Sequence, residues 1–247
     1  MNIKMIFLIG MTALSIAALS ACTADSPSEP PVSSNTLSEK EAQAGWRLLF
    51  DGKTTSGWRG YNQDSIPLGW IVEDGELVCG GQGGDIGGDI ITIEQYDNFE
   101  LNLEWKIAEG GNSGIFYHVV EDMKYQAPYE TGPEYQLIDD IGFPDPLEEW
   151  QKTGADYAMF TTSDQKILQP VGEWNLSKIV FDNGHVEHWL NGVKIVEFEA
   201  WSKEWDQKRE AGKWKDYPDY GTALTGHIGL QDHGHKIRFR NIKLKHL

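Results

Sequence analysis

The stretch Phe99-Glu-Leu-Asn-Leu-Glu-Trp-Lys-Ile107 decides the fold, because apolar and polar residues alternate strictly along its length. Five apolar side chains fall on one face of an extended chain: Phe99, Leu101, Leu103, Trp105 and Ile107. Successive side chains of a strand point to opposite sides, so this pattern predicts a long strand with one buried and one wet face. We therefore expect an antiparallel sheet with its core on one side.

Further short segments with strand-like patterns lie on either side of this stretch. They are Gly69–Glu73, Glu76–Cys79, Ser113–Val119, Glu134–Ile138, Lys178–Phe181, His185–Leu190, Val193–Phe198, Gly226–Gln231 and Ile237–Leu244. Three tight-turn signals join neighbouring segments: Asp74-Gly75, Asn183-Gly184 and Asn191-Gly192. Asp-Gly and Asn-Gly supply the positive φ angles that hairpins need. Helical segments are expected only at Ala200–Lys213 and, as a short turn, at Pro144–Lys152. These features predict an all-β sandwich or barrel.

The N-terminal residues have the pattern of an export signal. Lys4 precedes an apolar run that continues to about Leu19, and Ser20-Ala21-Cys22 resembles the lipobox of bacterial lipoproteins. We expect a signal peptide over residues 1–21, with Cys22 as the lipidated residue. Residues 22–44 are expected to be the lipid anchor and a flexible linker. Residues 45–247 then form one β-sandwich domain at the cell envelope, periplasmic or on the outer membrane, held to the membrane through the lipid only.

The charge balance excludes several classes of partner. The chain has 38 acidic and 21 basic residues, a formal net charge of −17. Removal of Lys4 with the signal would make the charge more negative. Such a chain is not expected to bind nucleic acid or the charged heads of anionic lipids. Apart from Cys22, the only cysteine is Cys79, so no internal disulfide is available and we expect Cys79 to be a core residue.

Ordered motifs along residues 45–247 resemble the bacterial 3-keto-disaccharide hydrolase family. The resemblance begins with Gly45-Trp-Arg-Leu-Leu-Phe-Asp-Gly-Lys53 and Gly57-Trp58. The other motifs are Glu-Gly-Gly-Asn-Ser-Gly-Ile-Phe-Tyr (109–117), Gly-Pro-Glu-Tyr-Gln (132–136), Gly-Glu-Trp-Asn (172–175), Glu-His-Trp-Leu-Asn-Gly (187–192), Leu-Gln-Asp-His-Gly (230–234) and Phe-Arg-Asn-Ile (239–242). The resemblance implies a concanavalin-like jelly-roll sandwich of two antiparallel sheets. It also implies a small carbohydrate substrate, oxidised to a ketone at C3 by an exported sugar 3-dehydrogenase.

A ketone at C3 of a sugar suggests which residue types the site needs. The ketone acidifies the C2 hydrogen, so a base can remove it and the C1 substituent can leave by elimination; water then adds back. The route needs a general base and a group that stabilises the enolate oxygen. It does not need the two carboxylates that flank the bond in ordinary glycosidases.

Two strand faces supply candidates for these roles. Glu134 and Gln136 share one face, and Glu134 is either the catalytic carboxylate or a solvated surface acid. Glu104 and Lys106 share another face. Lys106 either hydrogen-bonds the enolate or pairs with Glu104, which is also a candidate for substrate binding. Asn112, in the Glu-Gly-Gly-Asn-Ser-Gly-Ile-Phe-Tyr motif (109–117), is a further candidate for substrate binding.

The histidines of the C-terminal half leave more than one interpretation open. His188 is either the general base or a hydrogen-bonded core residue, since it alternates with Val186 and Leu190. His233 and His235 either bind a divalent metal that polarises the keto oxygen or face water from a loop. His233 is also expected to bind substrate, as is Gln231. No cofactor is certain from the sequence, and a divalent metal is the one candidate.

Two other functions fit parts of the sequence. A non-catalytic glycan-binding module would use stacking tryptophans, for which the candidates are Trp58, Trp105, Trp174, Trp189 and Trp201. A retaining hydrolase of the laminarinase type would carry a Glu-x-Asp-x-x-Glu strand motif, which is absent from the sequence. The leading hypothesis is a hydrolase or lyase that cleaves glycosidic bonds of 3-keto sugars.

Overall fold

The computed structural model describes Met1, residues 34–81 and residues 88–247. The expected signal peptide, Cys22 and most of the expected linker therefore lie outside the described residues. Within the described residues, no helix is both long and apolar enough to cross a membrane.

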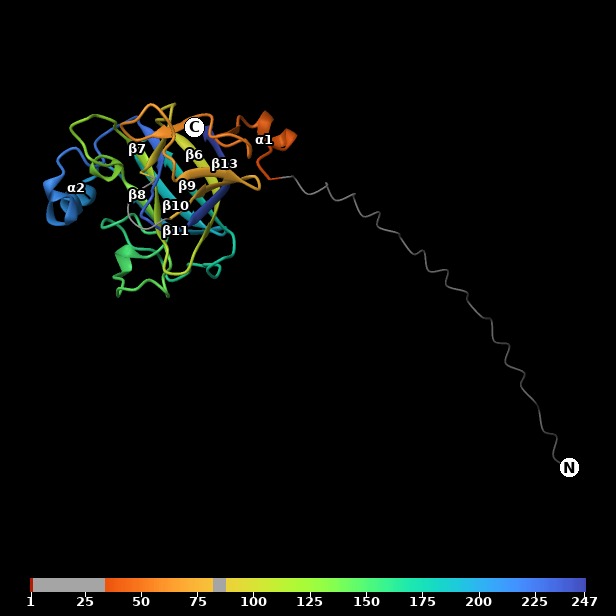
Figure 1. Ribbon diagram of the computed structural model, residues 1–247. Helices are drawn as coiled ribbons and strands as arrows, with labels where there is room; N and C mark the ends of the chain where they lie inside the picture. The colour runs from red at the N-terminus through yellow and green to blue at the C-terminus, as the bar shows by residue number, and fades with distance from the viewer. Residues whose placement is uncertain (2–33, 82–87) are drawn as a thin grey trace. The chain divides into compact units, whose positions relative to one another are not determined.

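The described residues from 34 onward form two antiparallel sheets (Figure 1). The larger sheet has the order β11 (Val193–Glu199), β10 (His185–Leu190), β9 (Asn175–Asp182), β6 (Phe99–Ile107), β13 (Ile237–His246), β4 (Glu76–Cys79) and β3 (Trp70–Glu73), and β1 (Arg47–Leu48) pairs with β13. The smaller sheet has the order β2 (Trp58–Gly60), β5 (Ile90–Thr92), β12 (His227–Leu230), β7 (Asn112–Val119) and β8 (Glu134–Ile138). The expected jelly-roll sandwich of two antiparallel sheets is confirmed.

Strand β6 shows the predicted alternation of buried and partly exposed side chains. Phe99, Leu103 and Trp105 are fully buried, whereas the residues between them are partly exposed. The apolar face of β6 packs in one core with Ile115 and Tyr117 of the smaller sheet. Burial of this face between the sheets stabilises the sandwich by about 25 cal/mol for each Å² of apolar surface removed from water.

The three predicted hairpin turns are present. Asp74 and Gly75 join β3 to β4, with φ angles of 52° and 79°. The Asn-Gly pairs at 183–184 and 191–192 also have positive φ and join β9 to β10 and β10 to β11. Left-handed backbone costs Asn, Asp and Gly less than other residues, so the sequence fixes these turns locally.

Helices are few and short among the described residues. They are α1 (Glu39–Gln43), α2 (Lys203–Ala211) and the 3₁₀ turns η1 (Pro128–Glu130), η2 (Glu149–Gln151) and η3 (Lys213–Asp216). The expected helix over 200–213 is shorter than predicted. Ser202 caps its start by accepting a hydrogen bond from the Trp205 backbone N–H, and the helix ends before Gly212.

The segment before residue 45 is more structured than expected. Asn35 is buried, and its Nδ2 donates to the carbonyl of Gly75 at 2.7 Å while its backbone N–H donates to Asn241 Oδ1. A capping box formed by Ser38 and Glu41 begins α1. The prediction of a flexible linker as far as residue 44 is therefore wrong for residues 34–44, because their polar groups are bonded to the sandwich.

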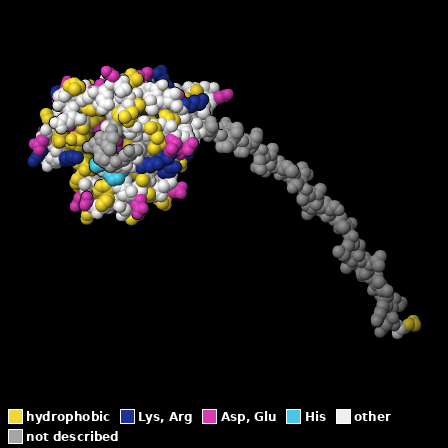
Figure 2. Space-filling view, in the orientation of Figure 1, with side chains coloured by type: hydrophobic (Ala, Val, Ile, Leu, Met, Phe, Trp, Pro, Cys, Tyr) yellow, Lys and Arg dark blue, Asp and Glu magenta, His cyan; other side chains and the backbone are white. Residues whose placement is uncertain are grey.

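Charged side chains of both signs are interspersed on the face of the molecule shown in Figure 2. On the outer face of the larger sheet many of them form ion pairs, such as Arg240 with Glu104 at 2.7 Å and Lys245 with Glu100 at 3.0 Å. Exposed pairs of this kind contribute little to stability, about 0–1 kcal/mol each. The outer face of the smaller sheet is different, because it holds a cavity.

Candidate active site

A polar cavity of about 480 Å³ lies over the outer face of the smaller sheet. This volume falls in the range of roughly 300–1,000 Å³ found for small-ligand pockets. Its lining residues come from β7, β8, η1 and η3, the segment after β12, and the segments around residues 61–63, 88–89, 126–127 and 157. They are Tyr61, Gln63, Gly88, Asp89, Asn112, Gln126, Ala127, Pro128, Tyr129, Glu134, Gln136, Tyr157, Lys213, Gln231, Asp232 and His233.

Glu134 is one of two buried carboxylates that line this cavity, the other being Asp232. Only 5% of the surface of Glu134 is exposed. Burial raises the pKa of Glu134 to about 8, while the charge of Lys213 opposes this and that of Asp89 adds to it. No hydrogen bond among the described residues contributes to this shift. A buried carboxylate whose pKa no hydrogen bond lowers binds protons strongly, so Glu134 is suited to exchange a proton near neutral pH.

Gly114 provides the space that the Glu134 side chain occupies. Residues of β7 and β8 are paired so that Phe116 lies opposite Glu134 and Gly114 lies opposite Gln136. A Cβ atom at Gly114 would lie 2.1 Å from Glu134 Oε1, which is far inside van der Waals contact. The absence of a side chain at 114 therefore permits the carboxylate to lie across the neighbouring strand.

Three carboxamide side chains surround the same cavity. Asn112 Oδ1, Gln136 Oε1 and Gln231 Oε1 are buried, and none has a hydrogen-bond partner among the described residues. An unsatisfied buried polar atom costs about 1–3 kcal/mol. Because carboxamides offer both donors and acceptors, these three residues can recover that cost by binding the hydroxyl groups of a ligand.

Lys213 brings a positive charge to the cavity from η3. Its Nζ lies 4.4 Å from the ring centroid of Tyr157, 4.7 Å from that of Trp214 and 5.8 Å from that of Tyr129. No carboxylate lies within salt-bridge distance of it in the part of the chain that the structure describes. Loss of water around the ammonium lowers the pKa of Lys213, and Glu134 opposes this change.

The backbone around Lys213 is held by a cluster of buried aromatic rings. Trp214 stacks on Tyr220 with ring centroids 4.0 Å apart, and Tyr220 stacks on Trp205 of α2. The Trp214 Nε1–H donates to the carbonyl of Tyr157 at 3.1 Å, and the Tyr157 backbone N–H donates to the carbonyl of Glu134 at 3.0 Å. Two hydrogen bonds thus connect the Trp214 indole, next to Lys213 in the chain, to the backbone of Glu134.

The structure brings five of the predicted site residues together at this cavity: Asn112, Glu134, Gln136, Gln231 and His233. They come from β7, β8 and the end of β12, which are adjacent strands of the smaller sheet. The sequence did not single out Lys213, Asp89 or Tyr157. Lys213 lies at the end of a segment expected to be a polar surface helix, and no local pattern distinguishes it from its neighbour Lys215.

Glu104 and Lys106 lie on the larger sheet, so the structure corrects their expected place in the site. Both are on the outer face of β6, where Glu104 pairs with Arg240 and accepts a hydrogen bond from Asn241 Nδ2. Lys106 lies over the Trp174 ring, with Nζ 4.5 Å from the centroid. The alternation along β6 was predicted correctly, but the sheet to which β6 belongs faces away from the cavity.

His188 lies between the sheets instead of in the cavity. It is fully buried, its Nδ1 is 3.0 Å from the carbonyl oxygen of Gly154, and its Nε2 is 3.3 Å from the Tyr117 hydroxyl. Burial lowers the pKa of His188 to about 4. Its position is that of a hydrogen-bonded core histidine, the second of the two interpretations, and it has no access to the cavity.

The two histidines proposed as metal ligands are placed differently from each other. His233 lines the cavity, whereas the ring of His235 is 6.1 Å from that of His233 and 6.4 Å from that of Phe143. His235 Nδ1 is buried without a partner among the described residues. A divalent metal on His233 and His235 stays a prediction.

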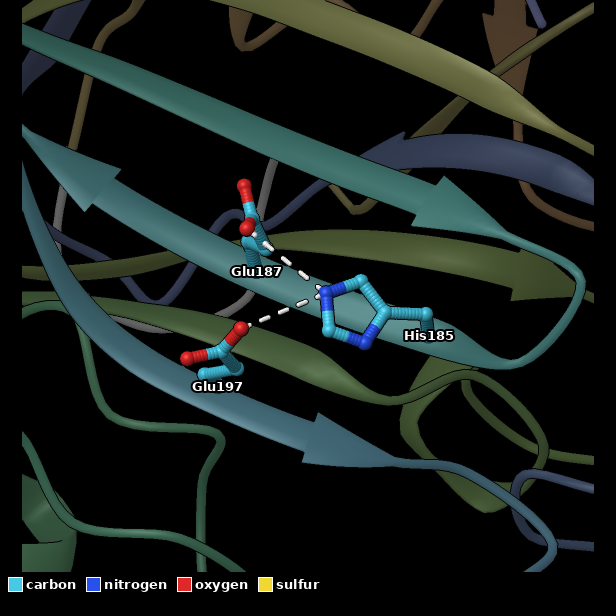
Figure 3. Close-up of side chains that lie close together, drawn as sticks. All are labelled: His185, Glu187 and Glu197. Carbon is cyan, nitrogen blue, oxygen red and sulfur yellow. Dashed lines mark ion pairs between the residues drawn. The ribbon is translucent and has the colours of Figure 1, made fainter.

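One group of metal-binding residue types is found elsewhere among the described residues. His185, Glu187 and Glu197 have ligand atoms within 4.8 Å of one another on β10 and β11 (Figure 3). His185 Nε2 is 3.6 Å from Glu187 Oε1 and 3.4 Å from Glu197 Oε1. Lys194 Nζ already pairs with both carboxylates, at 3.1 and 2.7 Å. The cluster belongs to the larger sheet and is separate from the cavity.

The tryptophans proposed for sugar stacking do not line the cavity. Trp58 and Trp105 are buried in the core, and Trp189 is covered by Lys178, whose Nζ lies 3.8 Å from its ring centroid. The aromatic residues of the cavity are Tyr61, Tyr129 and Tyr157. These rings give the otherwise polar cavity apolar edges against which a sugar ring can pack.

The fold and the cavity together define the class of the protein. A jelly-roll sandwich with a cavity that combines carboxamides, carboxylates and tyrosines is a β-sandwich suited to bind a small polar ligand such as a sugar. The family described as 3-keto-alpha-glucoside-1,2-lyase-like domain matches residues 45–245. The chain belongs to this family.

Individual relatives agree with this assignment. A 3-keto-disaccharide hydrolase of Bacteroides thetaiotaomicron is 36% identical to this chain, over 81% of this chain and 78% of that protein. A crystal structure from Parabacteroides distasonis ATCC 8503, assigned as a glycosyl hydrolase, has a TM-score of 0.82 at 46% identity and covers 87% of this chain and 100% of that one. A second structure from that organism with the same assignment has a TM-score of 0.63 at 27% identity, over 82% and 99% of the chains. The protein is thus a carbohydrate-active enzyme of the glycoside-cleaving kind.

Proposed function

We propose that the protein cleaves the glycosidic bond of 3-keto-glycosides by removal of the C2 proton, elimination of the C1 substituent and addition of water. The observation that carries the proposal is Glu134: a buried carboxylate on the floor of a polar cavity, with a pKa near 8. The names of the family and of its B. thetaiotaomicron relative support a 3-keto sugar as the substrate.

Glu134 is the general base in this proposal. Its ionised carboxylate takes the C2 proton, and the electron pair of the C–H bond passes to the C2–C3 bond as the keto oxygen becomes anionic. When the ketone re-forms, C1 and C2 become double-bonded and the C1–O bond breaks. The departing oxygen takes a proton from the neutral Glu134 carboxyl, which restores the carboxylate. Water then adds across C1 and C2, so the net reaction is hydrolysis.

The carboxamides orient the sugar in this proposal. Asn112, Gln136 and Gln231 bind hydroxyl groups of the ring that carries the ketone, which satisfies their unpartnered oxygens. Binding energy spent on these hydroxyls places C2 near Glu134, and such positioning lowers the barrier to proton transfer. His233, at the same cavity, is a further substrate-binding residue.

The experiment that tests the proposal compares an oxidised with an unoxidised sugar. Purified protein is incubated with a 3-keto-disaccharide and with the parent disaccharide, and the products are separated by chromatography. We expect release of the 3-keto monosaccharide from the first substrate and no reaction of the second. Glu134→Gln should be inactive, whereas Glu149→Gln, which also removes one negative charge but at an exposed position, should retain activity. Absence of cleavage of the 3-keto-disaccharide by the wild-type protein would overturn the proposal.

The cellular setting is also a proposal. Lipidation of Cys22 would hold the enzyme at the cell envelope, periplasmic or on the outer membrane. Its substrate must be made by an enzyme that oxidises the C3 hydroxyl of a sugar, so an exported sugar 3-dehydrogenase is the expected functional partner. The support for the anchor is the sequence pattern before Cys22.

A further inference from the structure

Proton removal from C2 leaves negative charge on the keto oxygen, and the cavity needs a group to stabilise it. A hydrogen-bond donor or cation placed at the developing charge usually makes a large contribution to catalysis. Lys106, the lysine expected for this role, lies on the other sheet. Among the described residues that line the cavity, Lys213 is the only lysine or arginine.

We propose that Lys213 is a catalytic residue that donates a hydrogen bond to the C3 oxygen of the substrate as the enolate forms. The inference rests on the proposed function and adds to it the electrophilic half of the site. Lys213 keeps its proton throughout: the C2 proton goes to Glu134, and the ammonium only stabilises the anionic oxygen until the ketone re-forms.

The surroundings of Lys213 suit this role because they hold the cation without neutralising it. Tyr157 and Trp214 place ring faces within 4.7 Å of Nζ, and no carboxylate among the described residues pairs with it. Cation–π contacts favour the charged form of a lysine but occupy few of its N–H donors. Lys213 is exposed, like many lysines of this chain, but it differs from Lys166 and Lys194, which are both bound to carboxylates.

The position of Lys213 relative to Glu134 is set by two hydrogen bonds, one from the Trp214 indole and one between backbone groups. Trp214, next in the chain, donates to the Tyr157 carbonyl, and the Tyr157 N–H donates to the Glu134 carbonyl. Glu134 and Lys213 are also close enough for the charge of each to change the pKa of the other. A base and a cation held by one hydrogen-bonded frame can act on adjacent atoms of one ligand, here C2 and the oxygen on C3.

The test follows exchange of the C2 hydrogen. Wild type, Lys213→Met, Lys213→Arg and Lys215→Met are incubated with the 3-keto-disaccharide in D₂O, and deuterium at C2 and cleavage are measured by NMR. Lys215 is the matched control because, like Lys213, it is exposed on the same 3₁₀ turn, but it does not line the cavity. We expect Lys213→Met to lower kcat and the exchange rate by about 10²–10³-fold, the usual effect of losing one donor to an oxyanion.

The other variants make the result specific. Lys213→Arg should retain part of the exchange, since it preserves the charge, and Lys215→Met should behave as wild type. Unchanged exchange and kcat in Lys213→Met, or a change in KM alone, would overturn the role of Lys213 and leave the proposed function intact. If the wild type neither exchanges C2 nor cleaves, the proposed function fails and this inference fails with it. Thermal unfolding of each variant confirms that the effect is not a loss of folding.

Discussion

Replacement of Glu134 by glutamine should make the protein more stable at neutral pH while it abolishes catalysis. In the folded protein the pKa of Glu134 is raised from its ordinary value of 4.5 to about 8. A group whose pKa is raised on folding favours the folded state when protonated. The free-energy cost of burying the ionised Glu134 carboxylate is therefore absent below pH 4.5. The cost grows between pH 4.5 and 8 and is complete above pH 8.

The magnitude follows from the difference between the two pKa values. Each pKa unit corresponds to about 1.4 kcal/mol, so the ionised carboxylate costs the folded state at most about 5 kcal/mol above pH 8. At pH 7 the cost is about 3 kcal/mol. Glutamine has nearly the same shape and no charge. The free energy of unfolding of Glu134→Gln should therefore exceed that of the wild type by an amount that grows with pH over this window.

The assay is urea denaturation of both proteins at a series of pH values from 4 to 9. Glu149→Gln is the control, because it removes the same charge from this acidic chain at an exposed site where Lys152 Nζ lies 2.5 Å from the carboxylate. That ion pair lowers the pKa of Glu149, so this variant should lose stability slightly at neutral pH. A stability difference for Glu134→Gln that does not increase between pH 4.5 and 8 would refute the account of Glu134.

Three further predictions follow from the site and the N-terminal sequence. The pH profile of kcat/KM should rise to a plateau above pH 8 as Glu134 ionises and fall at higher pH as Lys213 loses its proton; a rate that decreases between pH 6 and 8 would contradict this. Gly114→Ala should lower kcat roughly 100-fold in steady-state assays, because the new Cβ displaces the Glu134 carboxylate. Gly229→Ala, whose Cβ would meet the Phe116 ring at 3.2 Å, should retain most of its activity. Equal losses in the two variants would contradict displacement of Glu134 as the cause. Cys22→Ser should move the protein from the membrane fraction to the soluble fraction and prevent labelling by radioactive palmitate, and a labelled Cys22→Ser protein would contradict lipidation at Cys22.

The features of the fold that could be predicted from the sequence are those that local patterns determine. Alternation along Phe99–Ile107 predicted β6, and Asn-Gly or Asp-Gly pairs predicted three hairpins. Strands β1, β2 and β5 were not predicted, since each has only two or three residues and no alternation can be read from so short a segment. Their place in the sheets depends on distant partners.

The candidate site was predicted in part for a related reason. Period-two patterns tell which side chains share a strand face, and Glu134 with Gln136 was found in this way. They do not tell which sheet a strand joins, so Lys106 was assigned to the site although β6 belongs to the other sheet. Lys213 could not be predicted, because the aromatic cluster around Trp214 that places it in the cavity exists only in the folded chain.

The measurement that tests the central claim most directly is a crystal structure of Glu134→Gln with a bound 3-keto-disaccharide. The account predicts that the sugar occupies the cavity on the smaller sheet, with C2 facing residue 134, the C3 oxygen within hydrogen-bond distance of Lys213 Nζ, and ring hydroxyls on Asn112, Gln136 and Gln231. A sugar bound at another place on the sandwich, or bound in the cavity with C2 turned away from residue 134, would contradict the account.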